Sequence, residues 1–273
     1  MNALRSLALV IVASGTASSW AQAPSDYSCR FARVPVRDGI HLNTSICEPR
    51  GAHGPLPFLL TRTPYGIAGD TTVRQDYRFF ARDGYIFVFQ DIRGRYGSEG
   101  QFIMQRPPRA SSDTAGVDES TDTYDTVTWL LKNVPANNGR VGVLGVSYPG
   151  FLATMAGVNP HPAVKAISPQ APMTDTWMGD DFFHQGAFRL SYGFEYAGSM
   201  ELSSDSPLSG ELPIDTWDTY EWYYRVGPLA NVDTKYFRGK VPTWKAFENH
   251  PSYDSFWQTR AVQRRLRAPL VPT

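Results

Sequence analysis

Short apolar runs that alternate with amphipathic helical patterns are the feature that most constrains the fold of this chain. Four runs have the character of buried strands, at residues 56–63 (LPFLLTRT), 85–90 (YIFVFQ), 141–146 (VGVLGV) and 164–168 (VKAIS). Three helical patterns stand between them, at residues 71–82, 122–133 and 150–158, and residues 137–139 (NNG) predict a turn. Continuous apolar strands that alternate with helices are typical of a parallel sheet whose two faces are both covered. The sequence therefore predicts an α/β fold.

The composition excludes several classes of protein. The 273 residues carry 26 basic and 26 acidic side chains, so the formal net charge is zero. A nucleic-acid-binding domain needs a basic surface to contact phosphates, and we therefore expect no nucleic acid partner. Hydrophobic residues make up 42% of the chain, which indicates a globular protein and not a disordered one. We find no metal-binding motif and expect no cofactor.

The first residues have the pattern of an export signal. Arg5 supplies a positive charge, residues 7–13 (LALVIVA) form a short apolar run, and residues 21–23 (AQA) match a small-x-small cleavage site. The apolar run is too short to span a bilayer. We expect residues 1–23 to be a signal peptide and the mature protein to be periplasmic or secreted, without any other membrane anchor.

Export would place the two cysteines in an oxidising compartment, where disulfides form. Cys29 and Cys47 flank a turn signal at residues 37–39 (RDG), between predicted strands at 29–36 and 41–47. A three-residue loop would place the two cysteines opposite each other, whereas a two-residue turn would place them on opposite faces. The sequence leaves a disulfide and two buried thiols as alternatives.

The alternating pattern ends near residue 170. From residue 171 to residue 267 the chain is rich in aromatic side chains and has few strand signals, which predicts a mostly helical insertion over one end of the sheet. Residues 268–273 (APLVPT) then begin as another strand would. We therefore expect the first part of an α/β core at 24–170, a helical cap at 171–267 and the start of the next core strand at 268–273.

The clearest chemical signal is a strand that runs into Gly-Val-Ser-Tyr-Pro-Gly (residues 145–150) and then into a helix. A serine at such a sharp turn projects its hydroxyl away from the sheet, and small neighbours make room for the bend. The backbone N–H of Tyr148, at the start of the helix, can face a bound carbonyl. Proline stands where the simple pattern has glycine, and it suits a first helical turn. The pattern favours Ser147 as a nucleophile, with an ordinary turn serine as the alternative.

This motif and other stretches resemble the cocaine-esterase and X-prolyl dipeptidyl peptidase type of serine hydrolase. The other stretches are 37–39 (RDG), 62–66 (RTPYG), 90–100 (QDIRGRYGSEG), 122–130 (DTYDTVTWL) and 138–142 (NGRVG). Within this group, residues 177–184 (WMGDDFFH) look most like the α-amino acid ester hydrolases, which also act on β-lactam antibiotics with a free α-amino group. The resemblance covers residue 32 to the C-terminus and implies an α/β-hydrolase fold with a helical cap.

The resemblance also implies roles for single residues. Ser147 matches the acylated nucleophile, and the Tyr148 N–H and the Tyr65 hydroxyl match the two donors of the oxyanion hole. Asp181 matches a member of a carboxylate cluster that binds the substrate ammonium, with the adjacent Asp180 as an alternative. Without the resemblance, Tyr65 would be a packed aromatic and Asp181 a solvated acid or a helix cap. The implied substrate is a small α-amino acid ester or amide.

The polar loop at residues 91–100 could be mistaken for a phosphate cradle. Its arginines and its Ser-Glu pair lack the spacing of a phosphate-binding loop. We expect a structural loop that holds the wall of the active site through pairs between arginines and carboxylates.

Two members of a catalytic triad are not evident in the sequence. In this fold the acid and the histidine follow the serine in that order, and we expect both to lie beyond Thr273, together with a β-sandwich domain and the rest of the carboxylate cluster. His250 with Asp254 is the less favoured alternative. Without an imidazole base Ser147 is a poor nucleophile, so this chain is expected to be truncated and inactive alone.

Other functions and assemblies stay open at this point. A related hydrolase of the X-prolyl peptidase type, another ester hydrolase and a non-catalytic binding module are the alternatives. A sheet that stops before its later strands would leave an unpaired edge, which favours association into homo-oligomers.

Overall fold

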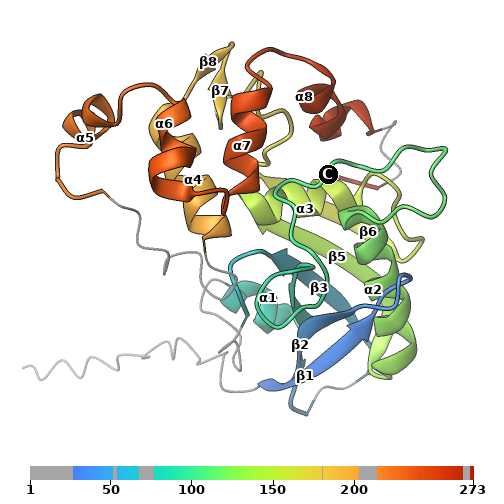
Figure 1. Ribbon diagram of the computed structural model, residues 1–273. Helices are drawn as coiled ribbons and strands as arrows, with labels where there is room; N and C mark the ends of the chain where they lie inside the picture. Colours follow the sequence, from blue (N-terminus) through green and yellow to red (C-terminus); the bar gives the residue numbers. More distant parts are fainter. Residues whose placement is uncertain (1–26, 52–53, 68–76, 180, 203–213, 267–270) are drawn as a thin grey trace, which may run out of the picture.

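The computed structural model describes residues 27–51, 54–67, 77–179, 181–202, 214–266 and 271–273, so the expected signal peptide lies outside the described residues. A six-stranded sheet forms its centre, in the order β1-β2-β4-β3-β5-β6 (Figure 1). Its strands are β1 (Tyr27–Pro35), β2 (His41–Pro49), β3 (Leu56–Thr63), β4 (Ile86–Asp91), β5 (Asn137–Val146) and β6 (Val164–Gln170). Strand β2 pairs in antiparallel fashion with both β1 and β4. The pairs β4–β3, β3–β5 and β5–β6 are parallel. The predicted α/β class with a mostly parallel sheet is confirmed.

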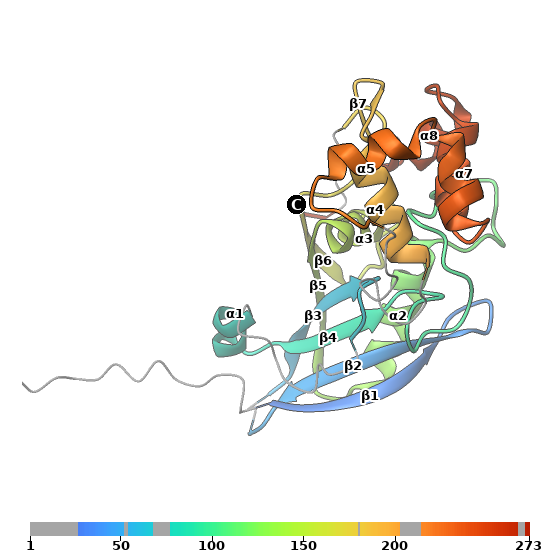
Figure 2. The ribbon, with the colours of Figure 1, turned by 60° about the vertical axis from the view of Figure 1, so that its left-hand side comes forward.

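Helices cover both faces of this sheet. The helices α2 (Glu119–Asn133) and α3 (Tyr148–Ala156) lie on one face, and the short α1 (Arg78–Asp83) lies on the other (Figure 2). On the first face, apolar side chains of α2 such as Val127 and Leu130 pack against strand residues such as Phe58. Of the helix predicted over residues 71–82, only the part from residue 77 is described.

Strand β5 begins earlier than the sequence indicated. A turn was expected at Asn137–Gly139, but these residues belong to β5, and Asn137 pairs with Leu56 of β3. The asparagine side chains still make turn-like bonds, since the Gly139 N–H donates to Asn137 Oδ1 at 2.9 Å. The turn prediction is wrong because pairing with β3 draws the segment into the sheet.

Helix α2 also begins earlier, at Glu119 instead of Asp122. The Asp118 side chain accepts from the Thr121 N–H at 2.9 Å, and the Thr121 hydroxyl oxygen accepts from the Asp118 N–H at 2.9 Å. This reciprocal capping box satisfies two backbone donors that the helix itself leaves unpaired. The cap therefore sets the start of the helix.

The two cysteines are joined by a disulfide. Strands β1 and β2 pair in a register that places Cys29 opposite Cys47, and their sulfur atoms are bonded. The Val36 N–H donates to the Ile40 carbonyl at 3.0 Å and closes a three-residue loop, in which Gly39 has a φ of 85°. Of the two alternatives for this hairpin, the structure thus has the three-residue loop.

A mostly helical segment follows β6 and lies above the carboxyl ends of the parallel strands (Figure 1). Its elements are β7 (Phe183–His184), β8 (Ala187–Phe188), α4 (Leu190–Glu201), α5 (Thr219–Val226), α6 (Ala230–Val232), the π-helix Asp233–Phe237, α7 (Pro242–Asn249), α8 (Ser255–Arg260) and the 3₁₀ turn Val262–Arg264. Its aromatic core is continuous with Tyr148 and Phe151 of α3. The helical segment and α3 therefore share one hydrophobic core, while the exact domain bounds stay a prediction.

The far edge of the sheet is β6. The Ile167 N–H of this strand donates to the Pro272 carbonyl at 3.0 Å, so the described C-terminal residues run beside it.

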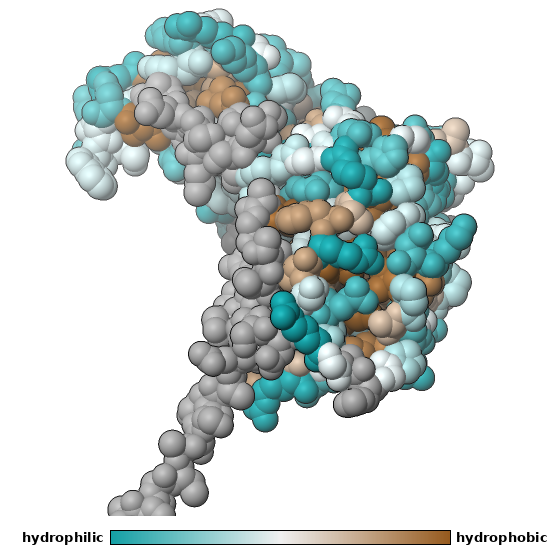
Figure 3. Space-filling model, turned by 90° about the horizontal axis from the view of Figure 1, so that it is seen from below, coloured by the Kyte–Doolittle hydropathy of each residue, from teal (hydrophilic) through white to brown (hydrophobic). Residues whose placement is uncertain are grey.

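Apolar side chains reach the surface at several places, among them Val146, which is 55% exposed, and brown patches are visible between hydrophilic side chains from below (Figure 3). Within the described ranges, no helix has both the length and the apolar character needed to cross a bilayer.

Candidate active site

Ser147 occupies a sharp turn between strand β5 and helix α3. Its backbone has φ 64° and ψ −124°, a combination that is costly for any residue with a side chain. The turn is held on both sides, because the Ser147 N–H donates to the Gln170 carbonyl and the Ser147 carbonyl accepts from the Phe151 N–H, each at 2.9 Å. Strained backbone that neighbours hold this firmly is common at functional sites.

Two glycines make this turn possible. A Cβ atom on Gly145 would lie 2.2 Å from the Pro149 carbonyl oxygen, and one on Gly150 would lie 2.3 Å from the Gln170 carbonyl oxygen. Both contacts are with backbone atoms, which cannot move aside as a flexible side chain can. Helix α3 can therefore start directly against the end of the sheet only if both positions lack a side chain.

The hydroxyl of Tyr65 meets the side chain of Ser147. Tyr65 follows the end of strand β3, and its hydroxyl forms a hydrogen bond of 2.8 Å with the hydroxyl of Tyr196 and interacts with the side chain of Ser147. Burial raises the pKa of Tyr65 above its ordinary value, and these two interactions offset part of that rise. The phenol therefore keeps its proton at neutral pH and can donate it in a hydrogen bond.

The loop that carries Tyr65 is held at three points. The Tyr65 N–H donates to Thr63 Oγ1 at 3.0 Å, and the Ile67 N–H donates to Asp91 Oδ1 at 2.9 Å. Arg95 Nε donates to the Pro64 carbonyl at 3.0 Å. The ring of Tyr65 thus projects from a fixed backbone, as a group that must act at one point in space requires.

Tyr148 contributes its backbone and its side chain in different ways. As the first residue of α3, it has an N–H for which the helix supplies no acceptor, directly beside Ser147. Its ring is buried, and its hydroxyl oxygen accepts from the Gln105 N–H at 2.6 Å. Because burial raises the pKa of this phenol, it stays neutral. The side chain therefore anchors the start of α3 while the N–H remains available to a bound oxygen.

A hollow of about 490 Å³ lies alongside Tyr65. It is bordered by the ends of β3 and β5 and by the start of α3, and its lining includes Tyr65, Gly66, Val146, Pro149 and Gln170. The hollow has the size of a site for a small organic molecule. Ser147, the Tyr65 hydroxyl and the first N–H of α3 thus lie close together at the carboxyl end of the sheet, beside this hollow.

Asp181 stands next to a residue that contacts this region. It is partly buried, and the side chain of Arg189 donates to its backbone carbonyl at 3.2 Å. The next residue, Phe182, packs against Tyr196 with ring centroids 6.1 Å apart. Asp180, the alternative, lies outside the described residues. The assignment of Asp181 to the substrate ammonium stays a prediction.

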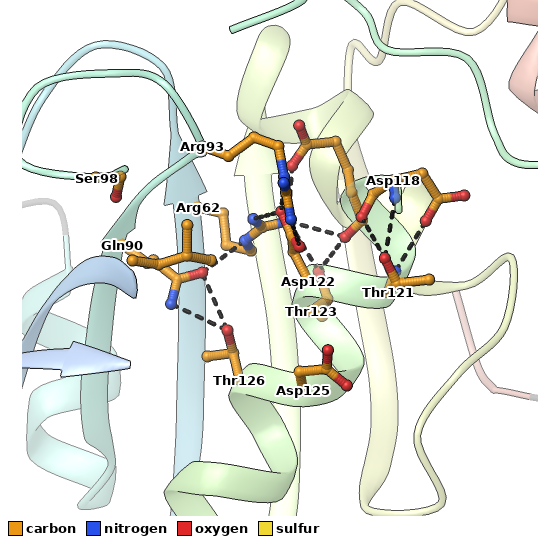
Figure 4. A network of polar contacts seen from close by, with 12 residues as sticks. Arg62, Gln90, Arg93, Ser98, Asp118, Thr121, Asp122, Thr123, Asp125 and Thr126 are labelled. Atoms are coloured by element: carbon orange, nitrogen blue, oxygen red, sulfur yellow. Dashed lines mark hydrogen bonds and ion pairs between the residues drawn. The ribbon is translucent and has the colours of Figure 1, made fainter. Parts of the chain in front are cut away.

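A buried network of ions and amides supports strand β3 (Figure 4). Arg62, three residues before Tyr65, donates to Gln90 Oε1 at 2.8 Å and pairs with Glu119 Oε2 at 3.0 Å. Burial raises the pKa of Glu119 even though Arg62 favours its charged form. These bonds fix strand β3 against β4 and helix α2.

The arginines of the loop after β4 are arranged partly as predicted. Arg93 pairs with Asp122 at 2.6 Å and with Asp38 at 2.8 Å, which confirms the expected pairs with carboxylates. Arg95 instead donates to two backbone carbonyls, those of Pro64 and, at 2.7 Å, Met200 of α4. It therefore connects the loop of Tyr65 with the helical segment.

Three of the described histidines have partners other than Ser147. His250 Nδ1 lies 2.6 Å from Asp254 Oδ2, between α7 and α8, and its ring stacks on Phe256. His41 contacts Glu99, and His161 accepts from the Ala163 N–H. The His250–Asp254 pair thus exists, but it links two helices of the helical segment.

Sequence reasoning missed Tyr196. It lies on α4, 131 residues from its partner Tyr65, in a stretch where tyrosines look like ordinary core residues. Tyr192 stands one turn earlier and stacks on it, with ring centroids 5.4 Å apart. No local pattern distinguishes a phenol that reaches across to another loop.

Known proteins share this arrangement of elements. A cocaine esterase from Rhodococcus sp. (strain MB1 Bresler) is 28% identical over 250 residues, which are 88% of this chain and 41% of the esterase. An aminopeptidase from a marine sediment archaeon, Thaumarchaeota archaeon, is 41% identical, with a TM-score of 0.83 over 90% of this chain and 42% of its own. An α-amino acid ester hydrolase is 36% identical, with a TM-score of 0.83 over 97% of this chain and 45% of its own.

The chain spans about two fifths of the length of these relatives. The family model described as X-Pro dipeptidyl-peptidase (S15 family) matches residues 38–273. That range includes the turn of Ser147, the loop of Tyr65 and the helical segment above them. The chain therefore belongs to the S15 family of X-Pro dipeptidyl-peptidases.

Proposed function

We propose that this chain carries the nucleophile and the oxyanion hole of a serine hydrolase that acts on ester or amide bonds. The observation that carries the proposal is the contact between the side chains of Ser147 and Tyr65 at the turn between β5 and α3. A hydroxyl on strained backbone, beside a neutral phenol and a helical N–H, has the geometry of acyl transfer.

In the proposed reaction Ser147 Oγ forms a bond to the substrate carbonyl carbon, and the carbonyl π electrons move onto oxygen. The Tyr148 N–H and the Tyr65 hydroxyl donate to that oxyanion. The serine proton passes to a general base and then to the leaving alcohol or amine, whose bond to carbon breaks. Water releases the acid by the same steps in reverse.

The base of this reaction is not assigned to any described histidine. His250 is bonded to Asp254 within the helical segment, and the matched relatives are more than twice as long as this chain. We place the base in the part of such a hydrolase that these 273 residues do not cover. On that view the 273 residues alone have negligible turnover.

For the substrate we propose an α-amino acid ester or amide, including β-lactam-type amides with a free α-amino group. The support is the similarity to an α-amino acid ester hydrolase and an aminopeptidase, together with Asp181 as an anion for the substrate ammonium. A dipeptidyl peptidase or another esterase is the second candidate, supported by the family and by the cocaine esterase. Asp181→Asn tests the ammonium recognition itself, because KM should rise sharply only for a substrate whose α-amino group Asp181 binds.

We further propose that the protein is exported. Residues 1–23 have the composition of a signal peptide, and an oxidising compartment suits the Cys29–Cys47 disulfide. Edman sequencing of the mature protein from a periplasmic fraction would give a start near residue 24. A start at Met1 would contradict export.

The direct test of the proposed function is the acyl-enzyme. In the protein at its natural length, an amino acid ester should add one acyl group, which peptide mass spectrometry locates on Ser147, and Ser147→Ala should abolish both the adduct and the turnover. The matched control is Ser168→Ala, which removes an exposed serine of β6 and should keep the adduct. An adduct that survives Ser147→Ala would contradict the proposal.

A further inference from the structure

We propose that Tyr196 of helix α4 is a positioning residue of the oxyanion hole, which donates its hydroxyl proton to Tyr65 and so aims the Tyr65 hydroxyl at the reacting oxygen. This inference rests on the proposed function, because it assigns a role within that oxyanion hole. It adds a residue from the helical segment to a site that is otherwise built from strand ends and helix α3.

The geometry of the two phenols carries the inference. The hydroxyl oxygens of Tyr196 and Tyr65 lie 2.8 Å apart, an ordinary distance for a hydrogen bond between hydroxyls. The Tyr196 ring is held by packing, since it stacks on Tyr192 at an interplanar angle of 7° and also contacts Phe182. The hydroxyl of Tyr196 therefore has a fixed position relative to Tyr65.

The direction of this hydrogen bond follows from counting protons. A tyrosine hydroxyl has one hydrogen to donate and lone pairs to accept with. If Tyr65 gives its hydrogen to Ser147 or to an oxyanion, its oxygen can only accept from Tyr196. The chain of donors is then Tyr196 to Tyr65 to the reacting centre, and hydrogen bonds in such a chain strengthen one another.

The backbones of the two tyrosines are tied together as well. Arg95 donates to the carbonyl of Pro64, the residue before Tyr65, and to the carbonyl of Met200, four residues after Tyr196 on α4. The side chain of Arg95 is almost fully buried, so water does not compete for these bonds. The separation of the two phenols is thus fixed by their backbones in addition to their own contact.

Tyr196→Phe tests the role, because it keeps the ring and its packing and removes only the donor. In the protein at its natural length we expect kcat to fall about tenfold with little change in KM, since the lost bond matters most when charge develops on the carbonyl oxygen. The affinity for a boronic acid, which forms an anionic tetrahedral adduct with serine, should fall by a similar factor.

A second measurement does not depend on turnover. Loss of a donor to its oxygen should raise the pKa of Tyr65, which can be followed by NMR titration of protein labelled with [¹³Cζ]tyrosine. Tyr65→Phe identifies the resonance. The matched control is Tyr192→Phe, one turn away on the same helix, which should leave both the Tyr65 titration and kcat unchanged.

The outcomes separate the two proposals. An unchanged Tyr65 titration, or an unchanged kcat in a folded Tyr196→Phe protein, would overturn the role of Tyr196 and leave Ser147 untouched. Full activity in Tyr65→Phe or Ser147→Ala would instead overturn the proposed function, whatever Tyr196 does. A fall in kcat, a raised Tyr65 pKa and an inert Tyr192→Phe together support the inference.

Discussion

At the scale of the residue, the site depends on positions that leave no room for a Cβ atom. We expect Gly145→Ala to destabilise the protein by about 3 kcal/mol, because the new methyl group would overlap the Pro149 carbonyl. Gly142→Ala, in the same strand, is the control, since its nearest contact is the flexible end of Leu59 at 3.3 Å. Chemical denaturation measures both, and equal stability of the two variants would contradict this account of the turn.

The difference between local and long-range contacts explains which site residues could be predicted from the sequence. The turn of Ser147 is a local problem, because a strand, two glycines and a helix within ten residues leave few other conformations. The same turn also assigns the Tyr148 N–H, whereas the Tyr65 hydroxyl could be given a role only through the family resemblance. Tyr196 could not be found at all, since its contact with Tyr65 exists only after a distant helix has packed onto the sheet.

At the scale of the element, the edge hairpin is cross-linked by Cys29 and Cys47. These residues are 18 positions apart, and closing a loop of that size in the unfolded chain is worth about 3 kcal/mol. We therefore expect the double variant Cys29→Ala/Cys47→Ala to unfold at a lower temperature, and reductant to lower the unfolding temperature of the unmodified protein only. Calorimetry with and without reductant checks this, and a variant as stable as the unmodified protein would contradict it.

Element type followed from the sequence more reliably than element bounds. The run LPFLLTRT became β3 with the predicted limits, since its apolar pattern is continuous. Helix α2 begins at Glu119, directly after its Asp118 cap and three residues before the expected start, because capping and not apolar periodicity sets where a helix begins. Asn137 belongs to β5 because it pairs with Leu56 of β3. Local turn preferences do not include such a contact between residues that are far apart in the sequence.

At the scale of the whole molecule, a cavity of about 190 Å³ lies between the helical segment and the core loop 101–105, and Glu201 lines it. Burial raises the pKa of Glu201 above its usual value, although hydrogen bonds from Thr243 favour the charged form. The folded protein therefore binds this proton more tightly than the unfolded chain does. Protonated Glu201 contributes most to stability below the pKa of glutamate in the unfolded chain, about 4.3. This contribution is lost as the pH rises through the pKa of Glu201 in the folded protein.

Glu201→Gln removes this titration. We expect the unfolding temperature of the unmodified protein, relative to that of Glu201→Gln, to fall as the pH is raised from about 4 to 7. Glu221→Gln, at an exposed position of α5, is the control variant. Thermal scans across this pH range measure the difference, and a relative unfolding temperature that rises with pH would contradict the sign derived from burial.

Arg95 has a consequence for attempts to redesign this enzyme family. Its guanidinium binds the loop of Tyr65 and helix α4 at the same time. The helical segment above the proposed site therefore also fixes the position of Tyr65. Replacing the helical segment by that of a relative, in order to change substrate preference, would also move the hydroxyls of Tyr65 and Tyr196. Such chimeras should have a lower kcat as well as an altered selectivity, unless the new segment keeps the α4 carbonyl to which Arg95 donates.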